Sequence, residues 1–319
     1  MFYSVIIPVY NRPQEIDELL ESLTHQTYQN FETLIIEDGS DEPCKEIVKK
    51  YEDCLNISYY YKENSGQGFS RNYGFERASG DYLVVFDSDC LIPRHYFEAV
   101  NDYLKENRLD AYGGPDRAHE SFTPVQKAIS YAMTSPFTTG GIRGNKHHAG
   151  TFHPRSFNMG ISRKVYGKTG GYRITRMGED IEFSIRIIEN GFRAGLIPDA
   201  YVYHKRRTSL TQFFKQLFFF GRARINIGRF YPSEVKVVHL LPAIFTAGFL
   251  FFLSTPFWNF SLFKLLAIPF GLFFILIFLD TALKNKSLYI GLLSMAASFI
   301  QLTAYGAGFV KECWTRIKE

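Results

Sequence analysis

The sequence predicts an α/β domain with a mostly parallel sheet, followed by a C-terminal helical transmembrane region. Apolar runs typical of strands alternate with helix-like segments from residue 1 to about 205, and this alternation favours a parallel sheet covered by helices. One run, residues 83–86, is continuously apolar, as expected for a strand buried on both faces. Phe, Leu, Ile, Ala and Gly dominate residues 210–310. We therefore expect a domain at 1–205, an amphipathic interfacial region at 206–234 and membrane helices at 235–319.

The first half can be divided into elements in chain order. Asn11 follows the first strand and is suited to cap the next helix, which has Pro13 in its first turn. From Pro115 to Arg155 the pattern becomes irregular, which favours a functional loop. The expected strands are 4–10, 31–38, 57–61, 81–86, 111–114, 158–162, 192–197 and 200–204. The expected helical segments are 16–23, 44–51, the segment after the loop at 64–72, 94–106 and 179–188.

Composition restricts the class of protein. The chain has 319 residues and a net charge of +4, which is too modest to indicate nucleic-acid binding. The N-terminus lacks the basic flank and cleavage site of a signal peptide, so we expect this half to stay in the cytoplasm. The four cysteines are scattered without metal-ligand spacing, and we interpret them as free thiols.

Two acids follow the buried strand at 83–86. Asp87 and Asp89, with Ser88 between them, stand where the chain leaves the sheet, and ligands of open α/β sheets bind at that edge. Two carboxylates one residue apart can hold a divalent cation whose other partner is a phosphate. The alternative is a solvated turn, because Asp and Ser are ordinary turn residues.

A glycine-rich loop at 64–72 opens a helix. Gly66 and its neighbours can approach a phosphate at the helix N-terminus, although a plain turn explains them as well. Arg71 lies in the first turn of that helix, where a cation opposes the helix dipole. This cost favours a specific partner for Arg71, such as a base carbonyl or a phosphate, over a solvated position.

A second acidic pair, Glu179 and Asp180, follows Gly178 at the start of a helix. Acids favour helix N-termini, so a purely structural explanation exists. The functional interpretation is a general base presented from a rigid element. His147 and His148 lie in the irregular segment, and adjacent side chains of this kind make a poor metal site.

Several short motifs occur together in order. Val5–Asn11, Gln26–Phe31, Glu37–Ser40, Gly66–Asn72, Asp87–Asp89 and Gly178–Asp180 form an ordered set that resembles glycosyltransferase family 2. The resemblance covers residues 3 to about 225 and points to the membrane-associated bacterial type. It implies a GT-A (Rossmann-like) nucleotide-sugar-binding domain, an inverting mechanism and a nucleotide-sugar donor.

The resemblance also implies roles for single residues. Pro8, Val9 and Tyr10 would line the pocket for base and ribose. Asp38 would hydrogen-bond the base, with Glu37 beside it, although the family more often has Asp at that position. Gly66 and Arg71 would close over the nucleotide.

The remaining implied roles concern the chemistry. Asp87 would face the ribose and the metal, and Asp89 would bind Mg²⁺ or Mn²⁺ directly. His204 matches a position that in some relatives makes a third contact to the metal or the pyrophosphate. Asp180 would be the catalytic base, with Glu179 near the acceptor.

The second half contains a basic, aromatic segment and three apolar stretches. Residues 205–224 interleave cations with Phe, as in a helix at a bilayer surface. Arg222 resembles only loosely the arginine of the Gln-x-x-Arg-Trp motif in processive relatives; it would contact a pyrophosphate or a lipid-linked phosphate, or else anionic head groups. The stretches 237–257, 262–282 and 288–310 are each long enough to span a bilayer.

The charges around the apolar stretches do not fit three full spans. With a cytoplasmic N-terminal domain, three crossings would place Lys311, Arg316 and Lys318 outside, against the positive-inside rule. Two to three spans are therefore expected, with one stretch re-entrant or interfacial.

These observations predict an inverting, metal-dependent glycosyltransferase on the cytoplasmic side of the inner membrane. The expected donor is a nucleotide sugar, with UDP as the first choice of nucleotide, and the expected acceptor is a polyprenyl-linked saccharide in surface polysaccharide or glycan synthesis. The expected partners include membrane lipids but no nucleic acid. A non-catalytic membrane scaffold with the same fold, and a metal-dependent phosphohydrolase or nucleotidyltransferase, are the alternatives; for an aspartyl-phosphate hydrolase, Leu91 replaces the expected Thr or Val.

Overall fold

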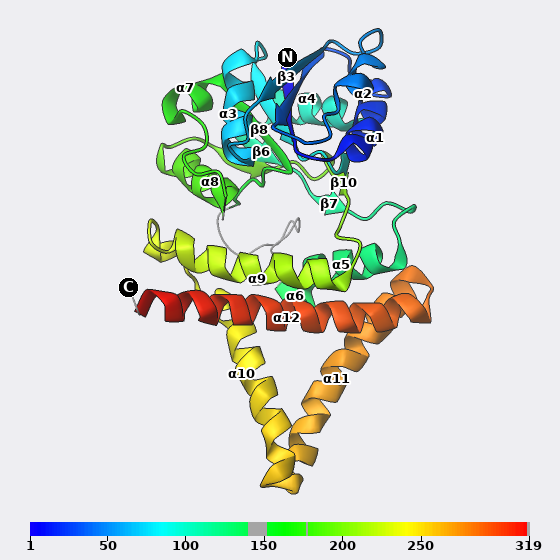
Figure 1. Cartoon of the computed structure of the whole chain (residues 1–319), viewed down its shortest axis with the longest axis vertical. Coiled ribbons are helices and arrows are strands. Elements are labelled where there is room, and N and C mark those ends of the chain that lie inside the picture. The colour runs from blue at the N-terminus through cyan, green and yellow to red at the C-terminus, as the bar shows by residue number, and fades with distance from the viewer. Residues whose placement is uncertain (140–151, 177, 318–319) are drawn as a thin grey trace. The chain divides into compact units, whose positions relative to one another are not determined.

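The computed structural model describes residues 1–139, 152–176 and 178–317. Among these residues the chain forms two compact units (Figure 1). Unit 1 is Met1–His119 with Gly144–Lys205, and unit 2 is Glu120–Arg143 with Arg206–Glu319, in each case as far as the residues are described. The predicted features at His147 and His148 lie outside the described residues.

Unit 1 is built on a seven-stranded sheet with the order β3-β2-β1-β4-β8-β6-β9. Strands β1–β4 are parallel neighbours, whereas β8 runs antiparallel to both β4 and β6. The mostly parallel sheet is therefore confirmed. Its strands are β1 (Tyr3–Val9), β2 (Phe31–Asp38), β3 (Ile57–Lys62), β4 (Tyr82–Phe86), β6 (Ala111–Gly113), β8 (Asn158–Ser162) and β9 (Ala194–Leu196).

Helices cover this sheet because their apolar faces match its buried strands. On one face, Leu19 and Leu20 of α1 and Phe97 of α4 pack against β1, β2 and β4. Phe75 of α3 and Phe183 of α8 join the hydrophobic cluster of the other face. The helices of unit 1 are α1 (Pro13–Thr24), α2 (Lys45–Lys49), α3 (Gln67–Arg77), α4 (Tyr96–Glu106), α7 (Arg163–Thr169) and α8 (Glu179–Glu189).

A small three-stranded sheet has the order β5-β10-β7. It consists of β5 (Cys90–Leu91), β10 (Val202–His204) and β7 (Asp116–Arg117). The pairing places His204 opposite Cys90, directly after the acids at the end of β4. Residues more than 100 positions apart in the sequence thereby reach one place.

Unit 2 is helical. Its segments are α5 (Pro124–Thr134), α6 (Pro136–Thr139), α9 (Leu210–Ile227), α10 (Leu241–Ser254), α11 (Phe260–Asn285) and α12 (Leu288–Ile317), with single 3₁₀ turns at Pro232–Glu234, Val237–His239 and Thr255–Phe257. Three helical segments in the described part of the chain are long and apolar enough to cross a membrane: Val237–Phe257, Phe260–Asn285 and Leu288–Ile317.

Two local expectations were wrong. The cap position of α1 is Arg12. The Asn11 side chain does not cap the helix but exchanges hydrogen bonds with the side chain and the backbone N–H of Asp41, in the turn after the second strand. The segment expected to be irregular contains α5, whose start is fixed by reciprocal hydrogen bonds between Thr123 and Gln126. The apolar face of α5, which includes Ile129 and Met133, packs in unit 2.

Candidate active site

The carboxyl end of β1 presents the first group of predicted residues. Pro8 is partly exposed, Val9 is buried and Tyr10 is 49% exposed, so only the outer members of this group can meet a ligand. Asn11 has a left-handed backbone (φ 52°), and its N–H donates to the Ser40 hydroxyl at 2.8 Å. This contact ties the end of β1 to the turn after β2, where the next two acids lie.

Glu37 and Asp38 have different surroundings at the end of β2. The Glu37 carboxylate is buried and accepts hydrogen bonds from the Ser40 hydroxyl and, at 2.7 Å, from the Cys44 N–H. It therefore organises the turn. Asp38 accepts from Lys62 at 2.5 Å and from the Gly66 N–H at 2.9 Å. Burial opposes ionisation of Asp38, but Lys62 and the loop N–H groups bring its pKa below the ordinary value.

Gly66 stands at the start of α3 with φ +87°, a conformation that favours glycine. A Cβ atom at this position would overlap the Thr175 side chain. The loop is thus held between Asp38 and Thr175. The structure explains why glycine is needed here on backbone and steric grounds, and its contact with a nucleotide stays a prediction.

Arg71 is fully buried and lies between two carboxylates. Its Nη2 is 2.8 Å from Asp87 Oδ1, its Nη1 is 3.4 Å from Glu179 Oε1, and its guanidinium faces the Tyr172 ring at 5.3 Å. Burial opposes its charge, yet Tyr172 and the two acids raise the pKa of Arg71 above its ordinary value. The sequence predicted a specific partner for Arg71, such as a base carbonyl or a phosphate, and the structure shows two carboxylates in that role. A contact of Arg71 with the donor stays a prediction.

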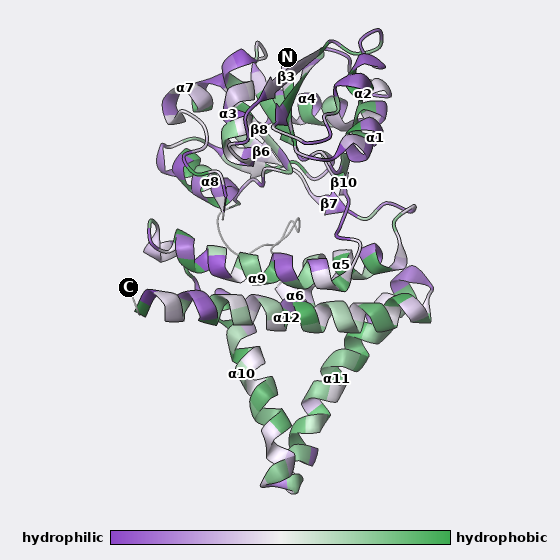
Figure 2. Cartoon of the chain, in the orientation of Figure 1, coloured by the Kyte–Doolittle hydropathy of each residue, from purple (hydrophilic) through white to green (hydrophobic). Residues whose placement is uncertain are grey.

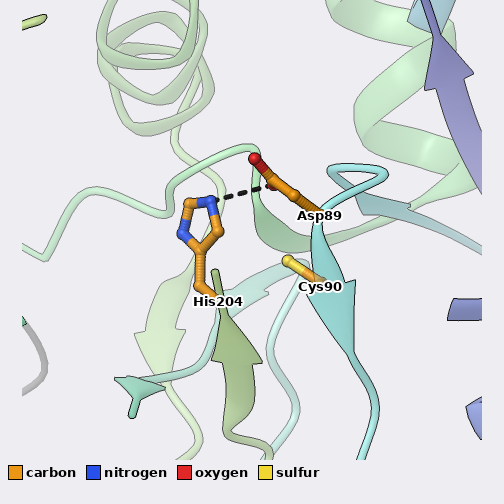
Figure 3. A group of neighbouring side chains, drawn as sticks. All are labelled: Asp89, Cys90 and His204. Carbon is orange, nitrogen blue, oxygen red and sulfur yellow. Dashed lines mark ion pairs between the residues drawn. The ribbon is translucent and has the colours of Figure 1, made fainter. Parts of the chain in front are cut away.

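The acids after β4 point to different partners. Asp87 is partly exposed beside Arg71, Ser88 is buried, and Asp89 is largely buried. Asp89 Oδ2 lies 2.6 Å from Arg12 Nη1, and Oδ1 lies 3.1 Å from His204 Nε2. Figure 3 shows His204 of β10 directed at Asp89. Burial would raise the pKa of Asp89, but His204 and Arg12 hold it well below its ordinary value.

The chemistry of this cluster fits a divalent cation. Asp89, Cys90 and His204 each offer a ligand atom, and these atoms lie within 4.8 Å of one another. The buried Nδ1 of His204 has no hydrogen-bond partner among the described residues. Cys90 is a poor ligand because burial raises the pKa of its thiol, which instead donates to the Phe157 carbonyl. A carboxylate and an imidazole suit Mn²⁺, and Mg²⁺ favours oxygen ligands such as Asp87 and Asp89.

Glu179 and Asp180 begin α8, as predicted, but have different surroundings. Glu179 is buried and accepts from Gln67 and Arg71. Burial and the neighbouring charge of Asp180 raise the pKa of Glu179, with Arg71 opposing. Asp180 is more exposed; it accepts from Arg155 at 3.2 Å and from the Ile181 N–H at 2.8 Å. Of the two acids, Asp180 is better placed to receive a proton from a substrate.

Arg222, the remaining predicted contact, belongs to α9 in unit 2. Its Nε is 2.8 Å from Glu312 Oε2 of α12. This ion pair gives Arg222 a role inside unit 2, and its contact with a phosphate stays a prediction.

Four contact residues were missed by the sequence analysis: Arg12, Lys62, Gln67 and Arg155. Arg12 directly follows the β1 strand, so its position at the carboxyl edge of the sheet was a usable signal. Lys62 ends β3 at the same edge. Gln67 is in the glycine-rich loop, whereas Arg155 lies in the segment expected to be irregular, where no pattern distinguishes it.

The sequence of unit 1 matches a known family. Residues 4–170, more than half of the chain, match the model described as "Glycosyl transferase family 2". The chain belongs to glycosyl transferase family 2.

Two curated relatives illustrate the range of this glycosyltransferase family. An "Uncharacterized glycosyltransferase" of Rickettsia bellii is 39% identical over 142 residues, which are 44% of this chain and 19% of the relative. The "Minor teichoic acid biosynthesis protein GgaB" of Bacillus subtilis is 35% identical over 215 residues, which are 64% of this chain and 23% of the relative. The chain thus spans about a fifth of the length of these relatives.

A solved structure shares the fold. A mannosyltransferase of Pyrobaculum calidifontis, in complex with GDP-Man and Mn²⁺, aligns with a TM-score of 0.70 at 18% identity, over 98% of this chain and 87% of that one. At this identity the likeness shows the fold alone. The predicted GT-A fold is therefore confirmed.

Proposed function

We propose that the chain is an inverting glycosyltransferase that moves a sugar from a nucleoside-diphosphate donor, first a UDP-sugar, to a hydroxyl of a polyprenyl-linked saccharide. The observation that carries this proposal is the position of Arg71, which contacts both Asp87 after β4 and Glu179 at the start of α8. Through this buried cation, the acids after β4, which would face the metal-bound diphosphate, are coupled to the turn that presents Asp180.

Donor binding is assigned to the carboxyl edge of the sheet. The base would stack near the exposed Tyr10 and hydrogen-bond at Asp38, whose loop is already ordered by Lys62 and Gly66. Asp87 is partly exposed and is available to the ribose. Asp89 and His204 would hold Mg²⁺ or Mn²⁺, and this cation supplies charge neutralisation for the departing diphosphate.

The acceptor is deprotonated at Asp180. Its Oδ2 oxygen would accept the hydroxyl proton while the acceptor oxygen bonds the anomeric carbon and the bond to the diphosphate breaks. A single displacement of this kind inverts the configuration of that carbon. Arg155 orients the carboxylate at 3.2 Å, and the backbone N–H of Ile181 fixes its second oxygen.

The three long apolar helices support a location in the cytoplasmic membrane, with the catalytic domain facing the cytoplasm. We assign catalysis to residues 1–205, interfacial contact to 206–234 and the transmembrane helices, two or three of which span the bilayer, to 235–319. Membrane insertion is the reason for assigning a lipid-linked acceptor, because such a substrate is confined to the bilayer.

The direct test uses the full chain purified in detergent. It measures release of nucleoside diphosphate from a panel of UDP- and GDP-sugars with Mg²⁺ or Mn²⁺, with and without polyprenyl-phosphate-linked saccharides. Lipid-stimulated release from one donor is expected. Asp180→Asn should bind that donor normally but lose transfer by about 10²–10⁴-fold, whereas Asp102→Asn, at an exposed acid of α4, should match the wild type.

Two results would overturn this function. Asp180→Asn with normal turnover would remove Asp180 from the role of base. Absence of release from every donor, together with nucleotide binding that is the same in Asp89→Ala and wild type, would favour the non-catalytic scaffold.

A further inference from the structure

The three apolar helices differ in how much of their surface the protein itself covers. In the most apolar windows of Val237–Phe257 and Phe260–Asn285, 6% of the residues are buried, whereas in Leu288–Ile317 the share is 44%. Among the described residues, most of those in the first two apolar windows therefore stay accessible, although both helices contact α12. Nearly half of the window in the third helix is covered by protein.

The partners of α12 lie along its whole length. It packs against α9 and α5, and it contacts both α10 and α11 (Figure 1). Phe299, near its middle, lies between the two arms of the α10–α11 hairpin, with its ring centroid 4.8 Å from that of Phe249 and 6.2 Å from that of Phe274. Helix α12 thus runs across the open end of the hairpin and does not continue it as a third parallel arm.

Close backbone approach fixes α12 on α9. A Cβ atom at Gly308 of α12 would overlap the carbonyl oxygen of Phe218 in α9, and one at Gly221 of α9 would overlap the carbonyl oxygen of Tyr305 in α12. Arg222 of α9 pairs with Glu312 of α12 at 2.8 Å. The two helices therefore lie side by side, at the same open end of the α10–α11 hairpin.

The hairpin has the dimensions and surface of a membrane insert. Val237–Phe257 has 21 residues and consists of α10 with a 3₁₀ turn at each end. At about 1.5 Å per residue it is about 32 Å long, which matches a hydrocarbon core of about 30 Å. A Cβ atom added at Gly248 or at Gly271 would have nothing within 4 Å, so both glycines face open space and leave room for a lipid chain. Figure 2 shows hydrophobic residues throughout α10 and α11, while hydrophilic residues gather at both ends of α12.

The positions of the cations around α12 agree with a membrane hairpin of α10 and α11 and a surface position for α12. Lys284 and Lys286 precede α12, and Lys311 and Arg316 are near its end. If α12 crossed the bilayer, these two groups would lie on opposite faces. If α12 lies along the surface, all four cations are on one face, as the positive-inside rule requires for a cytoplasmic face.

We propose that α10 and α11 alone cross the bilayer, as a hairpin, and that α12 lies in the membrane interface on the cytoplasmic side. The exposed side chains of α12 include Leu292, Val310 and Trp314, which suit the boundary between head groups and acyl chains. This inference rests on the membrane location proposed above and is independent of the sugar chemistry.

The test labels single cysteines with a membrane-impermeant maleimide in spheroplasts and in inverted membrane vesicles. Native Cys54, exposed in unit 1, reports the side of the catalytic domain in Cys313→Ser. Lys311→Cys and Ser261→Cys, each made with Cys54→Ser and Cys313→Ser, report α12 and the hairpin tip. We expect Cys54 and position 311 to react only in inverted vesicles, and position 261 only in spheroplasts.

The possible outcomes separate the claims. Loss of the chain from membranes in an alkaline carbonate wash would overturn the membrane location itself. Retention with position 311 labelled on the side opposite Cys54 would overturn the placement of α12. Labelling of position 261 on the Cys54 side, or on neither side, would overturn the two crossings. Failure of sugar transfer would leave all these conclusions unchanged.

A matched pair of glycine variants tests the packing of α12 against α9. Gly308→Leu introduces a side chain where α9 and α12 touch, and it should lower the melting temperature in detergent. Gly271→Leu adds the same side chain to the open face of α11 and should leave the melting temperature unchanged. Equal tolerance of both substitutions would show that the two helices are not in contact and would overturn the proposal.

Discussion

The carboxylate of Asp89 accepts a hydrogen bond from Arg12, with Nη1 2.6 Å from Oδ2. The two residues are 77 positions apart in the chain, and they meet because β1 and β4 are parallel neighbours that end at the same edge of the sheet. His204 approaches the other oxygen of Asp89. The proposed metal ligand is therefore already engaged by a permanent cation and by an imidazole.

Arg12 should compete with a metal ion for Asp89. Replacing it in Arg12→Ala frees Oδ2 and removes a positive charge, so Mn²⁺ should bind about fivefold more tightly, equivalent to roughly 1 kcal/mol for a partly buried pair. Electron paramagnetic resonance of free Mn²⁺ during titration measures this affinity without turnover. Arg94→Ala, at an exposed arginine before α4, is the control. Unchanged or weaker binding in Arg12→Ala would exclude competition.

Arg71 should be essential for folding as well as for the site. Arg71→Met leaves buried Glu179 without a cation and should reduce the free energy of unfolding by about 3–5 kcal/mol. Arg71→Lys should not restore it, because a single ammonium cannot reproduce the planar fork that contacts both Asp87 and Glu179. Thermal unfolding in detergent is the measurement. Wild-type stability in Arg71→Met would show that the bridge contributes little.

Asp38 should make stability depend on pH in the acid range. Its folded-state pKa is below the unfolded value of about 3.9, so its stabilisation is present above that pH and is lost as the pH falls through the folded-state pKa. Asp38→Asn should therefore lose on the order of 2 kcal/mol at neutral pH, with the difference from wild type shrinking below about pH 4. Melting temperatures from pH 3 to pH 7 check this.

The matched acid for that experiment is Asp102, whose exposed carboxylate pairs with Lys105. Asp102→Asn should change the melting temperature little at any pH, because exposed pairs contribute little. A difference between wild type and Asp38→Asn that is constant with pH would contradict the assignment to Asp38 ionisation.

Gly66 should be more sensitive to substitution than another glycine with the same backbone. Gly66 and Gly191 have φ values of +87° and +80°, but a Cβ atom overlaps Thr175 only at Gly66, and nothing lies within 4 Å at Gly191. Each alanine variant should lose about 1 kcal/mol from backbone strain. Gly66→Ala should lose more and also bind nucleotide more weakly, as calorimetry would show. Equal losses of stability in the two variants would mean that the Thr175 side chain moves to accommodate the new Cβ atom.

Much of the fold was predictable because it depends on local patterns. The apolar run before Asp87 indicated a buried strand, and Gly178 followed by two acids indicated the start of a helix. Since parallel strands end at one edge, the grouping of Asp38, Asp87 and Asp89 also followed from the sequence. Helix α5 was not predicted although Thr123 and Gln126 form a capping signature, because its apolar face packs in helical unit 2 and not on the sheet that the alternating pattern indicated.

The sequence by itself determined the α/β domain, the acids at its strand ends and the apolar stretches, since each depends on residues close together in the chain. Only the tertiary structure decided that Arg71 contacts Asp87 and Glu179, that Arg12 and His204 share Asp89, and that α12 lies along α9. These contacts join residues far apart in the sequence. Their geometry depends on strand order and on backbone approach at residues such as Gly308, which local periodicity does not specify.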